Sequence, residues 1–173
     1  LVLLLSGIGW YLGHQFEKAR TREEHLRIRA DELEEKLRDY RTEIYNQILE
    51  PFIIVFTKDE GLPKEYRGKN HMDAGSAKII SLDYKQAAFK LLLLGSDEVV
   101  KAYGNLMQFF YAMHAGEKPD PTTQELMSLL GKLLLEIRRS VGNETTELHH
   151  LEMLEFMITD IRKFQVNGKY PSQ

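Results

Sequence analysis

The chain has 173 residues, and 23 Lys and Arg nearly balance 26 Asp and Glu, which leaves a formal net charge of -3. This length is typical of one soluble core with an appendage. The chain has no basic excess of the kind that neutralises phosphates, so nucleic acid is not an expected partner. It contains no cysteine, which excludes disulfides, thiolate metal sites and cysteine nucleophiles.

The first segment, residues 1–13, reads LVLLLSGIGWYLG and carries no charge. Thirteen helical residues cover about 20 Å of a hydrocarbon core that is roughly 30 Å thick. We therefore expect residues 1–15 to be a transmembrane helix whose start precedes the given sequence. A buried core helix is the alternative, and a signal peptide fits least because no small-residue cleavage site follows.

The residues around the end of this segment predict how it sits in a bilayer. Trp10 and Tyr11 are typical interfacial aromatic residues, and the basic residues Lys18, Arg20 and Arg22 follow them closely. A basic excess marks the cytoplasmic side, so the domain beyond should be cytoplasmic. Small residues at helical spacing allow two membrane helices to pack closely, although they can also be incidental. Here they are Ser6, Gly9 and Gly13.

Residues 16–50 predict one long charged helix, because neither Pro nor Gly occurs between Phe16 and Ile44. Apolar positions recur at alternating spacings of three and four, which is a heptad pattern. The seam consists of Leu26, Leu33, Leu37, Tyr40 and Ile44, with Glu23 and two alanines at weaker positions. We expect this stalk to pack on other membrane-protein subunits or on a second copy. The alternative is a solvated single helix stabilised by i,i+4 charge pairs.

Residues 51–167 predict a helical bundle, followed by a tail at 168–173. FIIVFT after Pro51 is either a continued helix or a short buried strand, and residues 58–78 form the one long loop. Further helices should end at Gly95, run from Ser96 to near Gly116, and run from Thr122 or Thr123 to Gly142. A last helix is expected from about Thr146, with Leu151, Leu154, Ile158 and Ile161 inward. The fold class is therefore all-α, an up-and-down bundle.

Few residues carry recognisable chemistry. Glu147 and His150 form a single E-x-x-H, whereas di-iron bundles need two, so we expect no metal and place His149 and His150 at the surface or its rim. No nucleophile elbow or phosphate-binding loop is present, and we expect neither a cofactor nor an enzyme. Asp160, Arg162, Arg138 and Arg139 could form a structural ion network. Lys64, Arg67, Lys69 and Arg138 could bind an anion, the alternative being a solvated loop.

Two segments, GSDEVVKAY at 95–103 and LLLEIRRSVGN at 133–143, resemble a widespread group of uncharacterised bacterial proteins. Those proteins have a similar layout and end in a segment like MITDI at 157–161. The resemblance implies a bacterial origin and hence the inner membrane, with a single pass. We expect a non-enzymatic accessory or scaffold subunit of a membrane complex. The alternative is a membrane-anchored sensor or effector that binds a small anionic ligand, ahead of a hydrolase or metalloenzyme.

Overall fold

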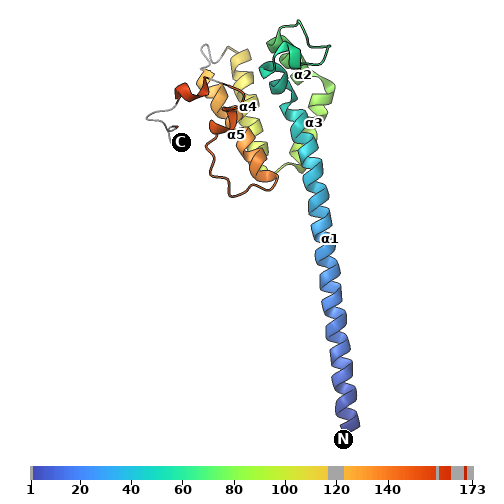
Figure 1. Cartoon of the computed structure of the whole chain (residues 1–173). Coiled ribbons are helices and arrows are strands. Elements are labelled where there is room, and N and C mark those ends of the chain that lie inside the picture. The colour runs from blue at the N-terminus through green and yellow to red at the C-terminus, as the bar shows by residue number, and fades with distance from the viewer. Residues whose placement is uncertain (1, 117–122, 159, 165–169, 171–173) are drawn as a thin grey trace. The chain divides into compact units, whose positions relative to one another are not determined.

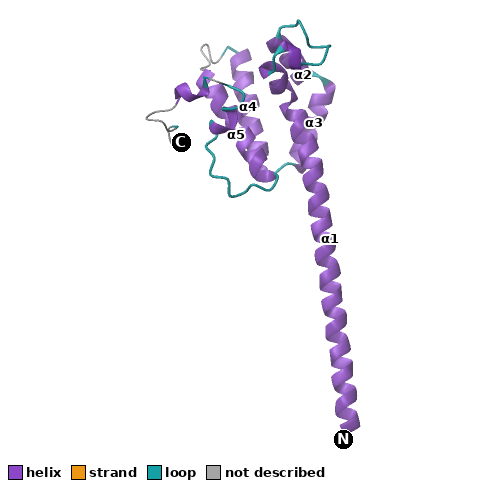
Figure 2. Cartoon of the chain, in the orientation of Figure 1, coloured by secondary structure: helices purple, strands orange, loops and turns teal. Residues whose placement is uncertain are grey.

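The computed structural model describes residues 2–116, 123–158, 160–164 and 170, with side chains from residue 22 onward except that of His114. All regular elements within these ranges are helices, which confirms the all-α class (Figure 2). The chain divides into two compact units, Leu1–Tyr40 and Arg41–Gln173.

Helix α1 spans Val2–Phe56, and Pro51 lies inside it. The segment after Pro51 is therefore helix rather than strand. A proline removes one backbone hydrogen bond from a helix, but Phe52 and Ile54 are buried here, and their packing outweighs that loss. Within the described part of the chain, no helix combines the length and apolar character that a bilayer crossing requires.

Helices α2 (His71–Ile80) and α3 (Leu82–Leu94) follow a short 3-10 turn at Asp59–Gly61. The predicted loop at 58–78 is thus too long, because Asn70 caps α2 by accepting from the Met72 backbone N–H at 2.9 Å. The helix predicted to end at Gly95 does end there, because Gly95 is the C-cap of α3, but it is not continuous. Ser81 has extended backbone and both ends α2 and caps α3, which divides that helix in two.

Helices α4 (Asp97–His114) and α5 (Thr123–Ser140) form an antiparallel pair (Figure 1). Their predicted limits are confirmed within a residue or two. Ser96 precedes α4 but its side chain makes no capping hydrogen bond. Gly142 has φ of 113°, a left-handed conformation that glycine adopts without strain. It lies two residues after the end of α5, in agreement with its predicted role as the terminator of that helix.

The helix predicted from Thr146 is wrong. Residues 141–158 contain turns and the 3-10 helix Glu152–Leu154, and a second 3-10 helix spans Ile161–Phe164. Side chains in this segment accept hydrogen bonds from backbone N–H groups. Glu152 accepts from the His149 N–H at 2.6 Å, and His149 accepts from the Leu151 N–H at 3.3 Å. Such bonds compete with a helix. Leu151, Leu154 and Ile161 are nevertheless buried, as expected.

The second part of α1 lies at the core of the unit Arg41–Gln173. Ile48 is fully buried there, and the Tyr84 hydroxyl donates to its carbonyl oxygen at 3.4 Å. Tyr45 and Ser140 share a hydrogen bond of 2.7 Å between α1 and α5. Residues 41–56 are thereby tied to α3 and α5, and the helical bundle forms around them.

Candidate functional site

A cavity of about 570 Å³ lies between α4, α5 and the segment after α5. Helix α4 contributes one face to it, because positions 98, 101, 102 and 105 are three or four residues apart. Its walls combine apolar surface from Leu129, Leu135 and Leu148 with a set of charged and polar side chains. They include Glu98, Lys101, Asn105, Lys132, Glu136, Arg139, Glu147, His149 and His150. Sequence patterns had singled out only four of these residues as chemically notable, and had not brought them together with α4.

The charges in this cavity are of both signs. Arg139 pairs with Glu136 at 2.5 Å on α5. Among the described residues, neither Lys101 nor Lys132 forms an ion pair. Glu98 and Glu147, which also line the cavity, carry the opposite charge. The cavity therefore presents both ammonium and carboxylate groups, which can bind polar groups of a small molecule.

His150 is buried, with 4% of its surface exposed, so the expectation that it lies at the surface or its rim is wrong. Its Nε2 atom lies 3.0 Å from the Ser128 hydroxyl. Burial lowers the pKa of His150 to about 4, and the neighbouring His149 and Lys132 act in the same direction. The imidazole is therefore neutral near pH 7, when it can serve as a hydrogen-bonding group but not as a cation.

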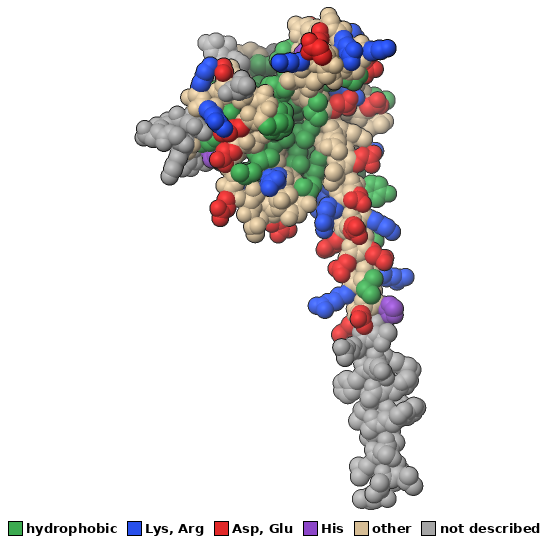
Figure 3. Space-filling model, in the orientation of Figure 1, with side chains coloured by type: hydrophobic (Ala, Val, Ile, Leu, Met, Phe, Trp, Pro, Cys, Tyr) green, Lys and Arg blue, Asp and Glu red, His purple; other side chains and the backbone are tan. Residues whose placement is uncertain are grey.

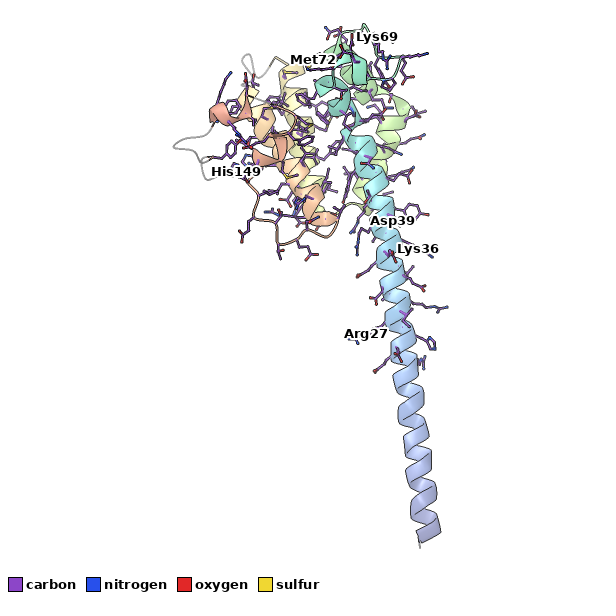
Figure 4. The ribbon with its side chains drawn as sticks, viewed as in Figure 1. Arg27, Lys36, Asp39, Lys69, Met72 and His149 are labelled. Carbon is purple, nitrogen blue, oxygen red and sulfur yellow. The ribbon has the colours of Figure 1, made fainter. Side chains whose placement is uncertain are left out.

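His149 lies beside His150, with ring centroids 4.0 Å apart, and its ring stacks on Tyr170 at 5.1 Å. Its Nδ1 atom accepts from the Leu151 N–H. In the neutral ring the proton consequently sits on Nε2. This Nε2 atom is buried and has no hydrogen-bond partner among the described residues. Figure 4 shows His149 beside the α4 and α5 pair.

Gly131 on α5 allows the histidine segment to approach the helix. A Cβ atom at this position would lie within van der Waals overlap of the His150 carbonyl oxygen, at 2.2 Å. A glycine inside a helix is intrinsically destabilising, so it commonly has a packing reason. The isolated glycine in LLGKLLLEI was the one sequence signal that could have indicated this contact.

The E-x-x-H residues do line this cavity together. Within the described residues, no group of three or more potential ligands is arranged to hold a metal ion.

The residues proposed for anion binding do not gather at one place. Arg67 donates to the Leu62 carbonyl oxygen at 2.6 Å, within its own loop. Arg138 donates to the Thr146 hydroxyl at 3.2 Å. Lys69 lies beside α2, at the end of the unit opposite to the last turn of α5 (Figures 1 and 4). Lys64 is exposed on the loop.

The four residues considered for an ion network form separate local contacts instead. Arg162 pairs with Glu155 at 2.8 Å, and Lys163 pairs with Asp160 at 2.5 Å. The Arg162 guanidinium and the Tyr170 hydroxyl together lower the pKa of Glu155. The two ion pairs join residues close in sequence, and the Tyr170 hydroxyl donates to Glu155 at 2.8 Å.

The stalk exposes its apolar seam. Leu26, Leu33 and Tyr40 are 59%, 66% and 62% exposed, whereas Ile44 is 4% exposed. Leu37 is half-buried. Figure 3 shows apolar side chains as isolated patches among the charges of the described part of α1. The side chains of Ser6, Gly9, Trp10, Tyr11, Gly13, Lys18 and Arg20 lie outside those described, and Arg22 is exposed.

Helix α3 carries a second exposed apolar surface. Leu82, Phe89 and Leu93 are 70%, 68% and 81% exposed. Their spacing of seven and four residues places them on one face of the helix. Exposed apolar stripes of this kind commonly mark contact sites.

No family model, curated protein or solved structure matches the chain.

Proposed function

We propose that this chain is a non-enzymatic, membrane-anchored accessory or scaffold subunit that binds other membrane-protein subunits through α1. The single observation that carries the proposal is the exposed seam of Leu26, Leu33 and Tyr40. These residues recur every seven positions, so they lie along one side of the helix. A charged helix that only had to stay in solution would not need them.

The exposed seam of α1 is apolar surface that association would remove from water. Burying one leucine side chain stabilises an assembly by about 2 kcal/mol, at roughly 25 cal/mol per Å². A partner helix that covers the seam would bury several such side chains at once. Leu26, Leu33 and Tyr40 stay exposed in the single chain, so association with another helix would cover them.

Anchoring is supported by the sequence pattern of residues 1–15. That segment is uncharged up to Gly13 and is followed by Lys18, Arg20 and Arg22. Basic residues next to an apolar segment favour a cytoplasmic position. The proposal therefore assigns the helical domain to the cytoplasm at the bacterial inner membrane.

The test is gentle detergent extraction of the full chain, followed by sizing and mass spectrometry of what travels with it. We expect a larger assembly that the variant Leu33→Gln loses. The matched control is Ile28→Gln, because Ile28 is 50% exposed but lies off the seam. A wild-type chain that migrates alone, or equal behaviour of both variants, would refute the proposal.

The cavity at α4 and α5 favours a second candidate, a sensor that binds a small anionic ligand. Lys101 and Lys132 are available there, and the His149 Nε2–H has no partner among the described residues. This function is tested by titrating the chain with inorganic phosphate and with acetate while the NMR chemical shifts of its imidazole groups are recorded. We expect saturable shifts of the His149 signal that Lys132→Gln weakens. Unchanged signals with both anions would count against it.

A further inference from the structure

The charges of α1 are distributed unevenly around its seam. With Leu26, Leu33 and Tyr40 at heptad position d, the positions that flank the seam are e and g. Between residues 22 and 40 those flanking positions hold Arg22, Arg27, Arg29, Glu34 and Lys36. Four of these five are basic. This is so even though the same stretch contains seven acidic and five basic residues.

The acidic residues of this stretch gather instead on the outer positions b, c and f, which face away from the seam. Those positions hold Glu24, His25, Ile28, Asp31, Glu32, Glu35, Arg38 and Asp39. Five of the eight are acidic and one is basic. Arg27, Lys36 and Asp39 are labelled along α1 in Figure 4. The helix therefore presents an apolar seam with basic borders and an acidic back.

A second copy of the chain fits this surface poorly. In a parallel pair, each g residue lies opposite the e residue five positions further along the partner. Arg22 would then oppose Arg27. Lys36 would face position 41, where Arg41 donates to the Leu94 carbonyl oxygen of its own chain at 2.6 Å. Glu23, at an a position, would oppose its own copy. Only Arg29 would meet an opposite charge, at Glu34, and like charges at these positions disfavour pairing.

We propose that the seam of residues 22–40 binds a helix of a different protein, whose own apolar seam is bordered by acidic residues. Glu or Asp at the partner's e and g positions would face Arg22, Arg27, Arg29 and Lys36, in either a parallel or an antiparallel arrangement. The apolar side chains supply affinity, and the charged borders select the partner. This inference rests on the proposed function and adds the chemistry of the partner to it.

The experiment uses the full chain in detergent and two designed peptides with the same apolar heptad seam. One peptide has Glu at every e and g position, and the other has Lys there. Binding is measured by fluorescence anisotropy at low salt. We expect the Glu peptide to bind at least about tenfold more tightly than the Lys peptide, because several border pairs change sign together. Added salt should reduce this difference.

Two matched variants test whether the borders carry the selectivity. Arg27→Glu reverses a border charge, and we expect it to reduce the preference for the Glu peptide about threefold. Arg38→Glu makes the same chemical change at an outer position and should leave the preference unchanged. Equal binding of both peptides, or equal effects of both variants, would overturn the inference.

The remaining outcomes separate this inference from the proposed function. A homodimer that excludes both peptides would overturn the acidic partner while leaving a seam-mediated assembly in place. Binding to vesicles that contain anionic lipid, without binding to the Glu peptide, would overturn it in favour of a lipid surface. Loss of assembly in Leu33→Gln together with equal peptide affinities would uphold the proposed function alone. An assembly that is indifferent to Leu33→Gln would refute the proposed function itself.

Discussion

Two stretches of α1 follow one heptad pattern and differ in what covers it. Between residues 22 and 40, Leu33 and Tyr40 are 66% and 62% exposed; beyond residue 40, Ile44 and Ile48 are 4% and 0% exposed. The second stretch is covered by other helices of its own chain. An apolar seam therefore predicts association in general, and the tertiary structure decides whether the partner is internal.

The largest expected difference concerns unfolding. Ile48→Ala should lower the free energy of unfolding by about 3 kcal/mol, because it removes buried methyl groups and leaves a cavity. Leu33→Ala should change it by less than about 0.5 kcal/mol in the dissociated chain, since the side chain is exposed. Chemical denaturation followed by circular dichroism measures both. Equal effects would contradict the difference between the two stretches.

A glycine pair tests the same contrast between covered and open positions within the bundle. Gly131→Ala should destabilise the fold by about 2 kcal/mol, because the new methyl group would overlap the His150 carbonyl oxygen. Gly104 on α4 has open space where a Cβ atom would be added. Gly104→Ala should therefore raise the free energy of unfolding by about 0.5 kcal/mol, because alanine has the higher helix propensity. Thermal melting shows whether each variant unfolds at a lower or a higher temperature than the wild type. A neutral Gly131→Ala variant would mean that the histidine segment does not need this close approach.

Acid should destabilise the bundle through His150. Its pKa is about 4 in the folded chain, against 6.5 for an unperturbed histidine, so the unfolded chain binds more protons between these values. The contribution of His150 to the free energy of unfolding is therefore fully present above pH 6.5. It is lost as the pH falls toward 4, which lowers the free energy of unfolding by up to about 3 kcal/mol.

The check is denaturation at several pH values with His150→Gln, which cannot gain this proton and should show a shallower pH dependence. His25→Gln, at an exposed position of the stalk, is the control and should retain the wild-type dependence. Identical profiles for wild type and His150→Gln would exclude His150 as the cause.

The smallest effect compares two tyrosines of α1. Tyr45→Phe removes a hydroxyl that shares a 2.7 Å hydrogen bond with Ser140, and should cost about 1 kcal/mol. Tyr40→Phe should be neutral because Tyr40 is 62% exposed. Urea denaturation resolves a difference of this size. A neutral Tyr45→Phe would show that the bond between α1 and α5 contributes nothing net.

Much of the bundle was predictable because its signals are local. The heptad spacing indicated α1, and Gly142 marked the end of α5, where left-handed backbone favours glycine. The sequence-based prediction failed where local patterns are ambiguous. Spacings of three and four after Thr146 suit an α-helix but are equally met by turns and 3-10 segments. The two-helix division at Ser81 was missed because a serine inside an apolar pattern is a weak stop signal.

The candidate cavity was less predictable than the seam. Its histidines were visible as a pair in the sequence, but their burial depends on Gly131 of another element. The separation of the loop cations from Arg138 likewise depends on which end of the bundle each element occupies. The spacing of residues along one helix does not determine how far that helix lies from another.

The sequence by itself determined the helical class, the heptad seam of α1 and the basic borders of that seam, because periodicity and charge position are properties of a single helix. Only the tertiary structure decided that Ile44 and Ile48 are covered while Leu26 and Leu33 are open, and that His150 is buried against α5. The physical reason is that burial depends on contacts between residues far apart in the chain, and no local pattern specifies which elements will meet.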